Sequence, residues 1–551
     1  MEPFRPTSAK LVKVLALLHT RSRLVPLLQT EVTASYEAAH AVAADADGNF
    51  FIGGCTSGNL NGFVSAGEDD FAVAKISGVD GSVLWSWQDG AAGNDCLSSA
   101  TATDDGGVVV GGYTNGTYNG VASEGSVDFA AIKLDPFGTV EWIWQQEGTA
   151  DDDFINSCSK TADGNMVLSG ATAGDWDGVG SGMADIVAVK LDVTDGSVLW
   201  RYQENAPLSN VVAFGSAARA DGSIVLAGWT DGNWFGELVG SIDFAAVALD
   251  EDGVELWRWQ GGHALGNNAA FGATALPDGS VVLAGETDGD FAGANSHAGG
   301  KDFAVVKLNA DGETEWTWQD GTENDDGFTG AATGTDGTSV VCAGYTFGSW
   351  VEPQAGTDEY KDFAGLSLDA DGSLLWTYQD GTTNSNEFRD VAVRPTDGAA
   401  LLVGWTHDDF VDGTSNIKSD AAGVLIETSA VAPAPTPDPD AEGGSSSVPL
   451  GPVIGGSVGG AALLAIVGVF AVKRHRARKN DKSFGASPGP TNHPVVSRGG
   501  GGGSVGNKGA ALPPPPPAYS EPAPPYAGPA HPGDDPPPPP AYSEPPAYSG
   551  R

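Results

Sequence analysis

Hydrophobic and polar residues alternate along short segments of the chain, and these segments recur at a nearly fixed interval. Two aromatic residues separated by one residue precede a Gln six times, first in Trp85–Gln88 and last in Trp376–Gln379. The six glutamines follow one another at intervals of 57 to 60 residues. Alternation of this kind places both aromatic side chains on one face of a β-strand. The pattern therefore predicts a repeated β-unit.

Three further marks keep the same interval. A Gly-x-Thr element begins at Gly54, Gly112, Gly170, Gly228, Gly285, Gly344 and Gly404, and an Asp-Phe-Ala element, degraded in two copies, begins at Asp70, Asp128, Asp185, Asp243, Asp302, Asp362 and Asp420. Asp-Gly pairs such as Asp163-Gly164 supply the positive φ angles that tight hairpins need. Units of about 58 residues, each with four short strands and an apolar face that a neighbour covers, predict an all-β, seven-bladed β-propeller over residues 25–430.

The two ends of the repeat region predict how the ring closes. The seventh copy has no aromatic strand after Val424–Ile426. Gln29 lies 59 residues before Gln88, in register with the repeated glutamines. We therefore expect Val25–Gln29 to supply the missing fourth strand of the last blade, although Pro26 is unusual inside a strand.

The repeats resemble the SBBP-type β-propeller repeat family, whose units contain Gly-x-Thr, a loop, Asp-Phe and a strand ending in an aromatic residue. The resemblance covers about residues 25–427 and implies a propeller, but that family carries no single activity. Asp80–Trp85 and Asp195–Trp200 both read Asp-Gly-Ser-Val-Leu-Trp. This segment also looks like the tryptophan-docking strand of quinoprotein propellers.

A long hydrophobic stretch follows the repeats. Val448–Val472 contains 25 residues without a charge. As a helix it would reach roughly 37 Å, enough to span a membrane. The basic cluster at 473–479 predicts a cytoplasmic C-terminus and an extracellular or lumenal propeller, in the plasma membrane or an endomembrane. A buried core helix, the alternative, would not carry such a cluster at one edge. Gly455 and Gly459 have the spacing that lets two membrane helices form a homodimer.

Three segments flank the propeller and the hydrophobic stretch. Residues 1–24 make a poor secretory signal or anchor, because the apolar run Leu11–Leu18 is short and contains Lys13. Residues 431–447 form a linker rich in Pro, Ser and Gly, which we expect to be extended and flexible. Residues 473–551 form a tail rich in Gly and Pro, which we expect to be disordered and cytoplasmic.

The tail contains the motif Pro-Pro-x-Tyr three times. Its copies are Pro516-Pro517-Ala518-Tyr519, Pro539-Pro540-Ala541-Tyr542 and Pro545-Pro546-Ala547-Tyr548. A polyproline II helix has three residues per turn, so Pro and Tyr can enter one aromatic groove together. The motif resembles the ligands of group I WW domains, as found in HECT-type ubiquitin ligases and adaptors. We therefore expect WW-domain partners, with an unspecific low-complexity tail as the alternative.

Composition excludes some classes of partner and reaction. A net charge of −45 repels phosphate backbones, so no nucleic acid partner is expected. Cys55, Cys96, Cys158 and Cys342 allow three disulfide pairings, and their unrelated repeat positions favour buried free thiols. The sequence has no Ser–His–Asp order, zinc-ligand spacing, nucleotide loop or paired-carboxylate motif. No catalytic residue and no cofactor is therefore predicted.

Two sets of residues are candidates for binding. Fragments of calcium loops occur at Asp45, Asp47, Asp250, Asp252, Asp369 and Asp371, although Asp-Gly turns explain them without a metal. Four residues after each Gly-x-Thr threonine stand Leu60, Tyr118, Trp176, Trp234, Phe291, Trp350 and Phe410. These side chains either pin their own loops or form an aromatic face for a protein or glycan ligand. Asn115 begins a glycosylation sequon, which suits an extracellular position.

These features favour a single-pass cell-surface interaction protein: a receptor, adhesion protein or scaffold, with a ligand-binding propeller outside and a WW-docking tail inside. Two alternatives belong to other classes. One is a membrane-anchored propeller enzyme, either quinoprotein-like or acting on glycans. The other is a structural protein of the cell wall or matrix.

Overall fold

A computed structural model of the chain describes residues 37–427 and 466–471. Short segments within the first range fall outside the description, namely 61, 124–126, 147–148, 150, 177–183, 205, 207–208, 264–265, 294–296, 352–359 and 408–419. The predicted N-terminal segment, closing strand Val25–Gln29, linker, most of the hydrophobic stretch and the whole tail also lie outside it.

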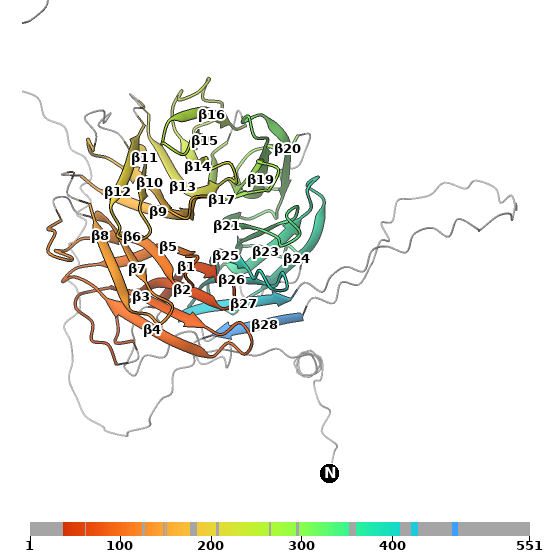
Figure 1. The fold of residues 1–551 in the computed structure, drawn as a ribbon. Coiled ribbons are helices and arrows are strands. Elements are labelled where there is room, and N and C mark those ends of the chain that lie inside the picture. The colour runs from red at the N-terminus through yellow and green to blue at the C-terminus, as the bar shows by residue number, and fades with distance from the viewer. Residues whose placement is uncertain are drawn as a thin grey trace, which may run out of the picture. The chain divides into compact units, whose positions relative to one another are not determined.

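In the described residues, twenty-eight strands form seven four-stranded antiparallel sheets, arranged as blades around a central axis (Figure 1). Blades 1 to 3 contain β1 (Glu37–Ala44), β2 (Phe50–Thr56), β3 (Asp70–Ile76) and β4 (Val83–Asp89); β5 (Asp95–Ala102), β6 (Val108–Thr114), β7 (Asp128–Leu134) and β8 (Val140–Gln145); and β9 (Asp153–Lys160), β10 (Met166–Thr172), β11 (Asp185–Leu191) and β12 (Val198–Gln203). Each blade is ordered from its innermost to its outermost strand.

Blades 4 to 7 repeat this order. They contain β13 (Val211–Ala218), β14 (Ile224–Thr230), β15 (Asp243–Leu249) and β16 (Glu255–Gly261); β17 (Asn268–Ala275), β18 (Val281–Thr287), β19 (Asp302–Leu308) and β20 (Thr314–Asp320); β21 (Asp326–Thr333), β22 (Val340–Thr346), β23 (Asp362–Leu368) and β24 (Leu374–Asp380); and β25 (Asn386–Val393), β26 (Ala400–Thr406), β27 (Asp420–Glu427) and β28 (Ile466–Ala471). Strand β25 contacts β1, which closes the ring. The predicted all-β, seven-bladed propeller is confirmed.

Hydrophobic side chains of adjacent blades form a shared core between them. Phe51 and Val73 of blade 1, for example, cluster with Val110 and Ile132 of blade 2. The two middle strands of a blade are buried along most of their length, as in β7 and β10. A blade therefore cannot bury its apolar faces alone, which explains why the repeats assemble into a ring.

The first aromatic residue of the fourth strand docks onto the next blade. Trp257 Nε1 donates a hydrogen bond to Ala310 O at 2.9 Å, and its ring packs on Gly312, which has φ +83°. A methyl group at Gly312 would lie 2.7 Å from that ring, so both the positive φ and the close approach require glycine. Equivalent bonds to the next blade are made by Trp85, Trp142, Trp200 and Trp316.

The repeated Gln and Asp form a clamp within each of the first six blades. Gln260 Nε2 donates to Asp243 Oδ2 at 2.9 Å and to Gly232 O at 3.0 Å, while its Oε1 accepts from Trp234 N at 3.1 Å. The fourth strand thereby holds the loop between the second and third strands. The same clamp is made by Gln88, Gln145, Gln203, Gln319 and Gln379.

The seventh blade takes its outer strand from the hydrophobic stretch that was expected to be a membrane helix. Strand β28 pairs with β27 in the register of the other blades, with Ala422 opposite Ala471. In blade 4 the equivalent pair is Ala245 and Gln260, so β28 has Ala where the other blades have the clamping Gln. Among the described residues, no helix has the length and hydrophobicity required to cross a bilayer.

The cysteines differ in part from the expectation. Cys158 and Cys342 are buried free thiols, as predicted. Cys55 and Cys96, expected to be free as well, form a disulfide with a Cα–Cα distance of 4.8 Å. They come from β2 and β5, which belong to adjacent blades whose faces meet. Contact between blades, which repeat positions alone do not reveal, is the reason for this correction.

Candidate site at the mouth of the central channel

Each innermost strand carries a β-bulge at the same repeat position. The pairing of the first and second strands skips one residue there, for instance between Ala39 and Ala41 of β1. A bulge leaves one residue without a ladder partner and redirects its side chain. The seven residues at this position line the central channel: His40, Ser98, Asn156, Phe214, Phe271, Thr329 and Arg389.

Three of these bulge residues join neighbouring innermost strands. Asn156 Nδ2 donates to Ala213 O at 2.8 Å, and Thr329 Oγ1 donates to Phe388 O at 2.7 Å. Ser98 Oγ donates to Ile155 O in the same way. Their polar groups are therefore engaged in the channel wall. His40, Phe214, Phe271 and Arg389 do not make such a bond to the next strand's carbonyl in any contact between described residues, and they present their side chains to the cavity.

The channel opens into a cavity of about 420 Å³. Besides the bulge residues, Glu286, Tyr345, Lys361 and Glu387 line it. A second, smaller cavity of about 190 Å³ is lined by the innermost strands of all seven blades, including Gly272 and Gly330. The volume of the larger cavity is in the range of small-molecule sites.

One side of this mouth is apolar. The rings of Phe214 and Phe271 meet edge to face, with centroids 5.2 Å apart and planes at 70°. They come from the innermost strands of blades 4 and 5. Neighbouring aromatic rings of this kind offer a surface for a further apolar or aromatic group.

The other side of the mouth is charged, over blades 5 to 7. Glu387 Oε2 is 2.7 Å from Lys361 Nζ, and its Oε1 is 3.2 Å from Arg389 Nη1. The Lys361 ammonium also lies 3.6 Å from the ring centroid of Tyr345. Tyr345 in turn donates through its hydroxyl to Glu286 at 3.0 Å, and Lys301 lies 2.5 Å from Glu286. Both lysines are therefore paired with carboxylates.

Arg389 retains capacity to bind a ligand. Its side chain lines the cavity and is 40% exposed, while its Nη1 lies 3.2 Å from Glu387. His40 occupies the next blade of the ring, and burial, followed by the positive charge of Arg389, lowers the pKa of His40 to about 4. The imidazole is therefore neutral at pH 7. His40 therefore adds no charge beside the guanidinium.

Four of the aromatic positions considered either for pinning their loops or for a ligand face pack against the preceding blade. Tyr118 packs on Phe71 of the preceding blade with ring centroids 5.3 Å apart, and Trp350 packs on Phe303 at 4.7 Å. Equivalent contacts join Trp176 to Phe129 and Phe291 to Phe244. Leu60 is fully buried, Trp234 is half-buried and Phe410 lies outside the described residues. The four ring contacts with the preceding blade therefore anchor these loops to the propeller.

The calcium candidates are not gathered at one place. Asp45 Oδ2 lies 2.9 Å from the ammonium of Lys75, which occupies the position a cation would take. Asp250 Oδ1 accepts from Val254 N at 2.8 Å, and Asp369 Oδ1 accepts from Ser373 N at 2.8 Å. Each of these carboxylates closes its own hairpin turn. Asp47, Asp252 and Asp371 lie in the same three turns, in blades 1, 4 and 6.

One group of three potential metal ligands occurs in the described part of the chain. The ligand atoms of His40, Cys55 and Cys96 lie within 4.8 Å of one another. The disulfide engages both sulfur atoms, so this group offers only the imidazole. The glycosylation candidate Asn115 is exposed on the loop between β6 and β7.

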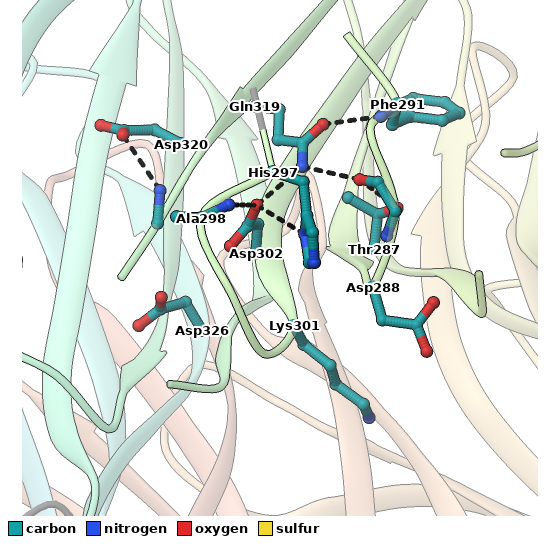
Figure 2. Close-up of polar contacts among 12 residues, drawn as sticks. Thr287, Asp288, Phe291, His297, Ala298, Lys301, Asp302, Gln319, Asp320 and Asp326 are labelled. Atoms are coloured by element: carbon teal, nitrogen blue, oxygen red, sulfur yellow. Dashed lines mark hydrogen bonds and ion pairs between the residues drawn. The ribbon is translucent and has the colours of Figure 1, made fainter. Parts of the chain in front are cut away.

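Buried acids meet where one blade joins the next. Asp302 and Asp326 are both fully buried, and a methyl group at Gly321 would lie 2.5 Å from Asp302 Oδ1 and 3.0 Å from Asp326 Oδ2 (Figure 2). Asp302 Oδ2 accepts from Gln319 and Ala298 N, whereas its Oδ1 has no partner among the described residues. The two carboxyl groups therefore converge on one point.

Between other pairs of blades, an Asn amide occupies the position that Asp326 occupies between blades 5 and 6. At Gly381, the equivalent of Gly321, the nearest side-chain atoms are Asp362 Oδ1 and Asn386 Nδ2. Burial raises the pKa of Asp326 to about 6, and the charge of Asp302 adds to the effect. Burial likewise raises the pKa of Asp153 to about 6. A protonated carboxyl can donate to its neighbour as the Asn amide does.

The channel mouth was missed at the level of sequence, although a signal exists. Its bulge residues stand 14 or 15 residues before the Gly of each Gly-x-Thr element, and Glu286 and Tyr345 are the middle residues of two such elements. The residue types at both positions differ among the seven repeats, although the neighbouring residues are repeated. A search for positions that vary among the repeats would have selected them.

No protein-family model matches the chain, and no curated protein matches it in sequence. The resemblance to SBBP-type repeats therefore stays a prediction.

Several solved structures are similar in fold. Hydrazine synthase from Kuenenia stuttgartiensis is 12% identical, with a TM-score of 0.43, over 68% of this chain and 94% of that one. Sqt1 from Chaetomium thermophilum is 11% identical, with a TM-score of 0.38, over 73% and 85%. A streptogramin B lyase is 10% identical, with a TM-score of 0.40, over 68% and 92%. These similarities carry no argument about function, and the fold follows from the chain's own sheet topology.

Proposed function

We propose that this chain is a single-pass cell-surface interaction protein that binds a ligand at the mouth of its propeller channel and docks WW-domain proteins through its tail. The ligand-binding part of the proposal rests on a contrast in sequence between the repeated residues that hold the blades together and the residues that line the channel mouth. The Gln–Asp clamp is the same in six blades, whereas the bulge residues range from Phe271 to Arg389. Binding sites are commonly built from variable positions held by a rigid scaffold.

The membrane part of the proposal rests on the sequence. The uncharged stretch Val448–Val472 and the basic cluster after it are typical of a membrane span with a cytoplasmic tail. Strand β28 uses six residues of this stretch, so strand and membrane helix exclude each other there. In the membrane-bound protein, Val25–Gln29 takes the outer position of blade 7, with Gln29 in register with the clamping glutamines.

The tail part rests on the three Pro-Pro-x-Tyr copies. Several copies on one chain raise the apparent affinity for proteins that carry more than one WW domain. Tyr526, which follows Pro525 without a spacer residue, offers a matched control. Replacement of Tyr519, Tyr542 and Tyr548 by Ala is expected to abolish capture of a tandem WW-domain protein, whereas Tyr526→Ala is expected to leave it unchanged.

The topology decides whether the proposal holds as a whole. The full chain would carry one epitope tag in an exposed propeller hairpin, next to Phe137, and a second at the C-terminus. Protease added outside intact cells is expected to remove the first tag and spare the second. Protection of both tags in intact cells, with loss of both after selective permeabilisation of the plasma membrane, would contradict a surface propeller.

A further inference from the structure

We infer that the channel mouth binds a small monocarboxylic acid that carries an aromatic or branched aliphatic group. This inference rests on the proposed function, because it names the ligand of the same site. Its basis is the juxtaposition of the Phe214–Phe271 pair with the Arg389 guanidinium across a cavity of about 420 Å³.

The guanidinium supplies the anion-binding element. Arg389 lines the cavity, its side chain is 40% exposed, and its Nη1 contacts Glu387. The exposed part of the guanidinium can therefore donate to an anionic ligand in the cavity. Arg presents its donors as a planar fork that matches the two oxygens of a carboxylate.

The charge balance at the mouth favours a monoanion over a dianion. The residues that line the cavity include two cations, Lys361 and Arg389, and two carboxylates, Glu286 and Glu387. A carboxylate adds one negative charge and can place it beside Arg389. A phosphate dianion would add two negative charges near Glu286 and Glu387, in a chain whose net charge is already −45.

The phenyl pair supplies the apolar element. Phe214 and Phe271 belong to blades 4 and 5, whereas Arg389 belongs to blade 7. The ring order therefore separates the aromatic group of the ligand from its carboxylate. His40, neutral at pH 7 and next to Arg389 in the ring, adds a polar partner without changing the charge.

The test uses the full chain in detergent micelles and a panel of acids: phenylacetate, 3-phenylpropionate, indole-3-acetate and 4-methylpentanoate. Matched amides of each acid remove the charge, and 2-phenylethyl phosphate raises it. Binding is measured by isothermal titration calorimetry and by saturation-transfer NMR. The variants are Arg389→Gln, Arg389→Lys and Phe271→Ala, with Phe137→Ala on an exposed turn as the control. Thermal unfolding of each variant checks that it folds.

At least one acid is expected to bind ten-fold or more tightly than its amide and than the phosphate. Arg389→Gln is expected to abolish that preference, Arg389→Lys to retain part of it, and Phe271→Ala to weaken acid and amide alike. The control variant should match the unaltered chain. Equal binding of acids and amides, tighter binding of the phosphate, or no binding by any acid would overturn the inference.

The outcome is separable from that of the proposed function. If no acid binds but protease reaches the propeller from outside the cell, the protein is a surface protein with a different ligand. Acid binding by a propeller that protease cannot reach from outside would leave the site correct and the cellular location wrong.

Discussion

The seventh blade differs from the other six in how it is fastened. In blade 4, Gln260 clamps Asp243 and Trp257 docks on blade 5. In blade 7 the register places Ala471 at the Gln position, and Gly468 stands opposite Leu425, where β16 has Trp257. The ring is nevertheless closed, through contacts of the innermost strands. A repeated contact that stabilises a blade is therefore not required at every joint.

The joint between blades 7 and 1 has contacts of its own. Asp390 Oδ2 accepts from Val42 N at 2.8 Å, and an Arg394 nitrogen donates to Gly78 O. The equivalents of Asp390 in blades 4 to 6 are Gly215, Gly272 and Gly330. Blade 7 is thus the one blade with a carboxylate at this repeat position.

The largest expected effect concerns which segment completes blade 7. Cysteines at Ala422 and Gln29 are expected to crosslink completely in cell membranes, whereas cysteines at Ala422 and Ala471 are expected to stay reduced. Directly opposed residues in antiparallel strands lie within disulfide range. Crosslinking is read from mobility on a non-reducing gel after mild oxidation.

Cysteines at Ala245 and Gln260 provide the positive control, because they occupy the same register in blade 4. Efficient crosslinking of the Ala422 and Ala471 pair in membranes would instead make β28 the functional outer strand. It would remove the membrane span from the proposed function.

Loss of the clamp Asp is expected to lower the free energy of unfolding more in blade 4, which has the clamping Gln, than in blade 7, which has Ala at that position. Asp243→Ala removes the acceptor of Gln260 Nε2, Val239 N and Gly240 N. We expect a loss of about 3–5 kcal/mol in the free energy of unfolding, because several donors become unsatisfied. Asp420→Ala is expected to cost less than half as much. Denaturant titration followed by tryptophan fluorescence measures both, and equal losses would show that blade 7 has a full clamp.

The closing carboxylate is expected to make stability depend on pH. Burial raises the pKa of Asp390 to about 7, whereas an unfolded Asp titrates near 4. Folding therefore takes up a proton between these values, so the contribution is present at low pH and is lost as the pH rises through 7. Asp390→Asn keeps the acceptor for Val42 N and is expected to raise the stability at pH 8 by about 1–3 kcal/mol.

The difference between this variant and the unaltered chain should vanish as the pH falls to about 4. Thermal unfolding at pH 4 to 8 provides the comparison. A constant difference across that range would show that Asp390 does not titrate there.

The smallest expected effect is the difference in stability cost between Gly→Ala substitutions at two equivalent turns, one of which contacts a tryptophan of the preceding blade. Gly312→Ala puts a methyl group against the Trp257 ring at a positive φ and is expected to cost about 2 kcal/mol. Gly81 lies at the equivalent turn of blade 1, and Gly81→Ala is expected to cost about 1 kcal/mol for its φ of +70° alone. Equal costs in thermal unfolding would indicate that a bulky side chain also docks on Gly81.

Sequence reasoning recovers the blades because their marks are repeated. Trp257, Gln260 and Asp243 each have counterparts at the same interval, so the period and the number of blades follow from counting. The bond between Gln260 and Asp243 was not foreseen. It links residues 17 positions apart across a hairpin, and repetition alone does not show which marks touch.

The site and the last strand resisted prediction for different reasons. His40, Phe271 and Arg389 share no chemistry, and a bulge depends on strand pairing, which no single residue encodes. The stretch that contains Ile466–Ala471 is uncharged and largely apolar, a pattern that fits a buried strand as well as a membrane helix. Length and flanking charge favoured the helix, whereas the open edge of β27 accepts the strand.

The bulge ring has a consequence for how such a molecule can diversify. A ring built from copies of one repeat is nearly symmetric, and equivalent side chains converge at its axis. Seven guanidiniums there would repel one another, so a charge is tolerated in one copy only if most others lack it. Arg389 is the single basic member of its ring. Ligand recognition at the axis therefore requires the repeats to differ in sequence at the bulge position. The Gln and Asp residues of the clamps can remain the same in the repeats.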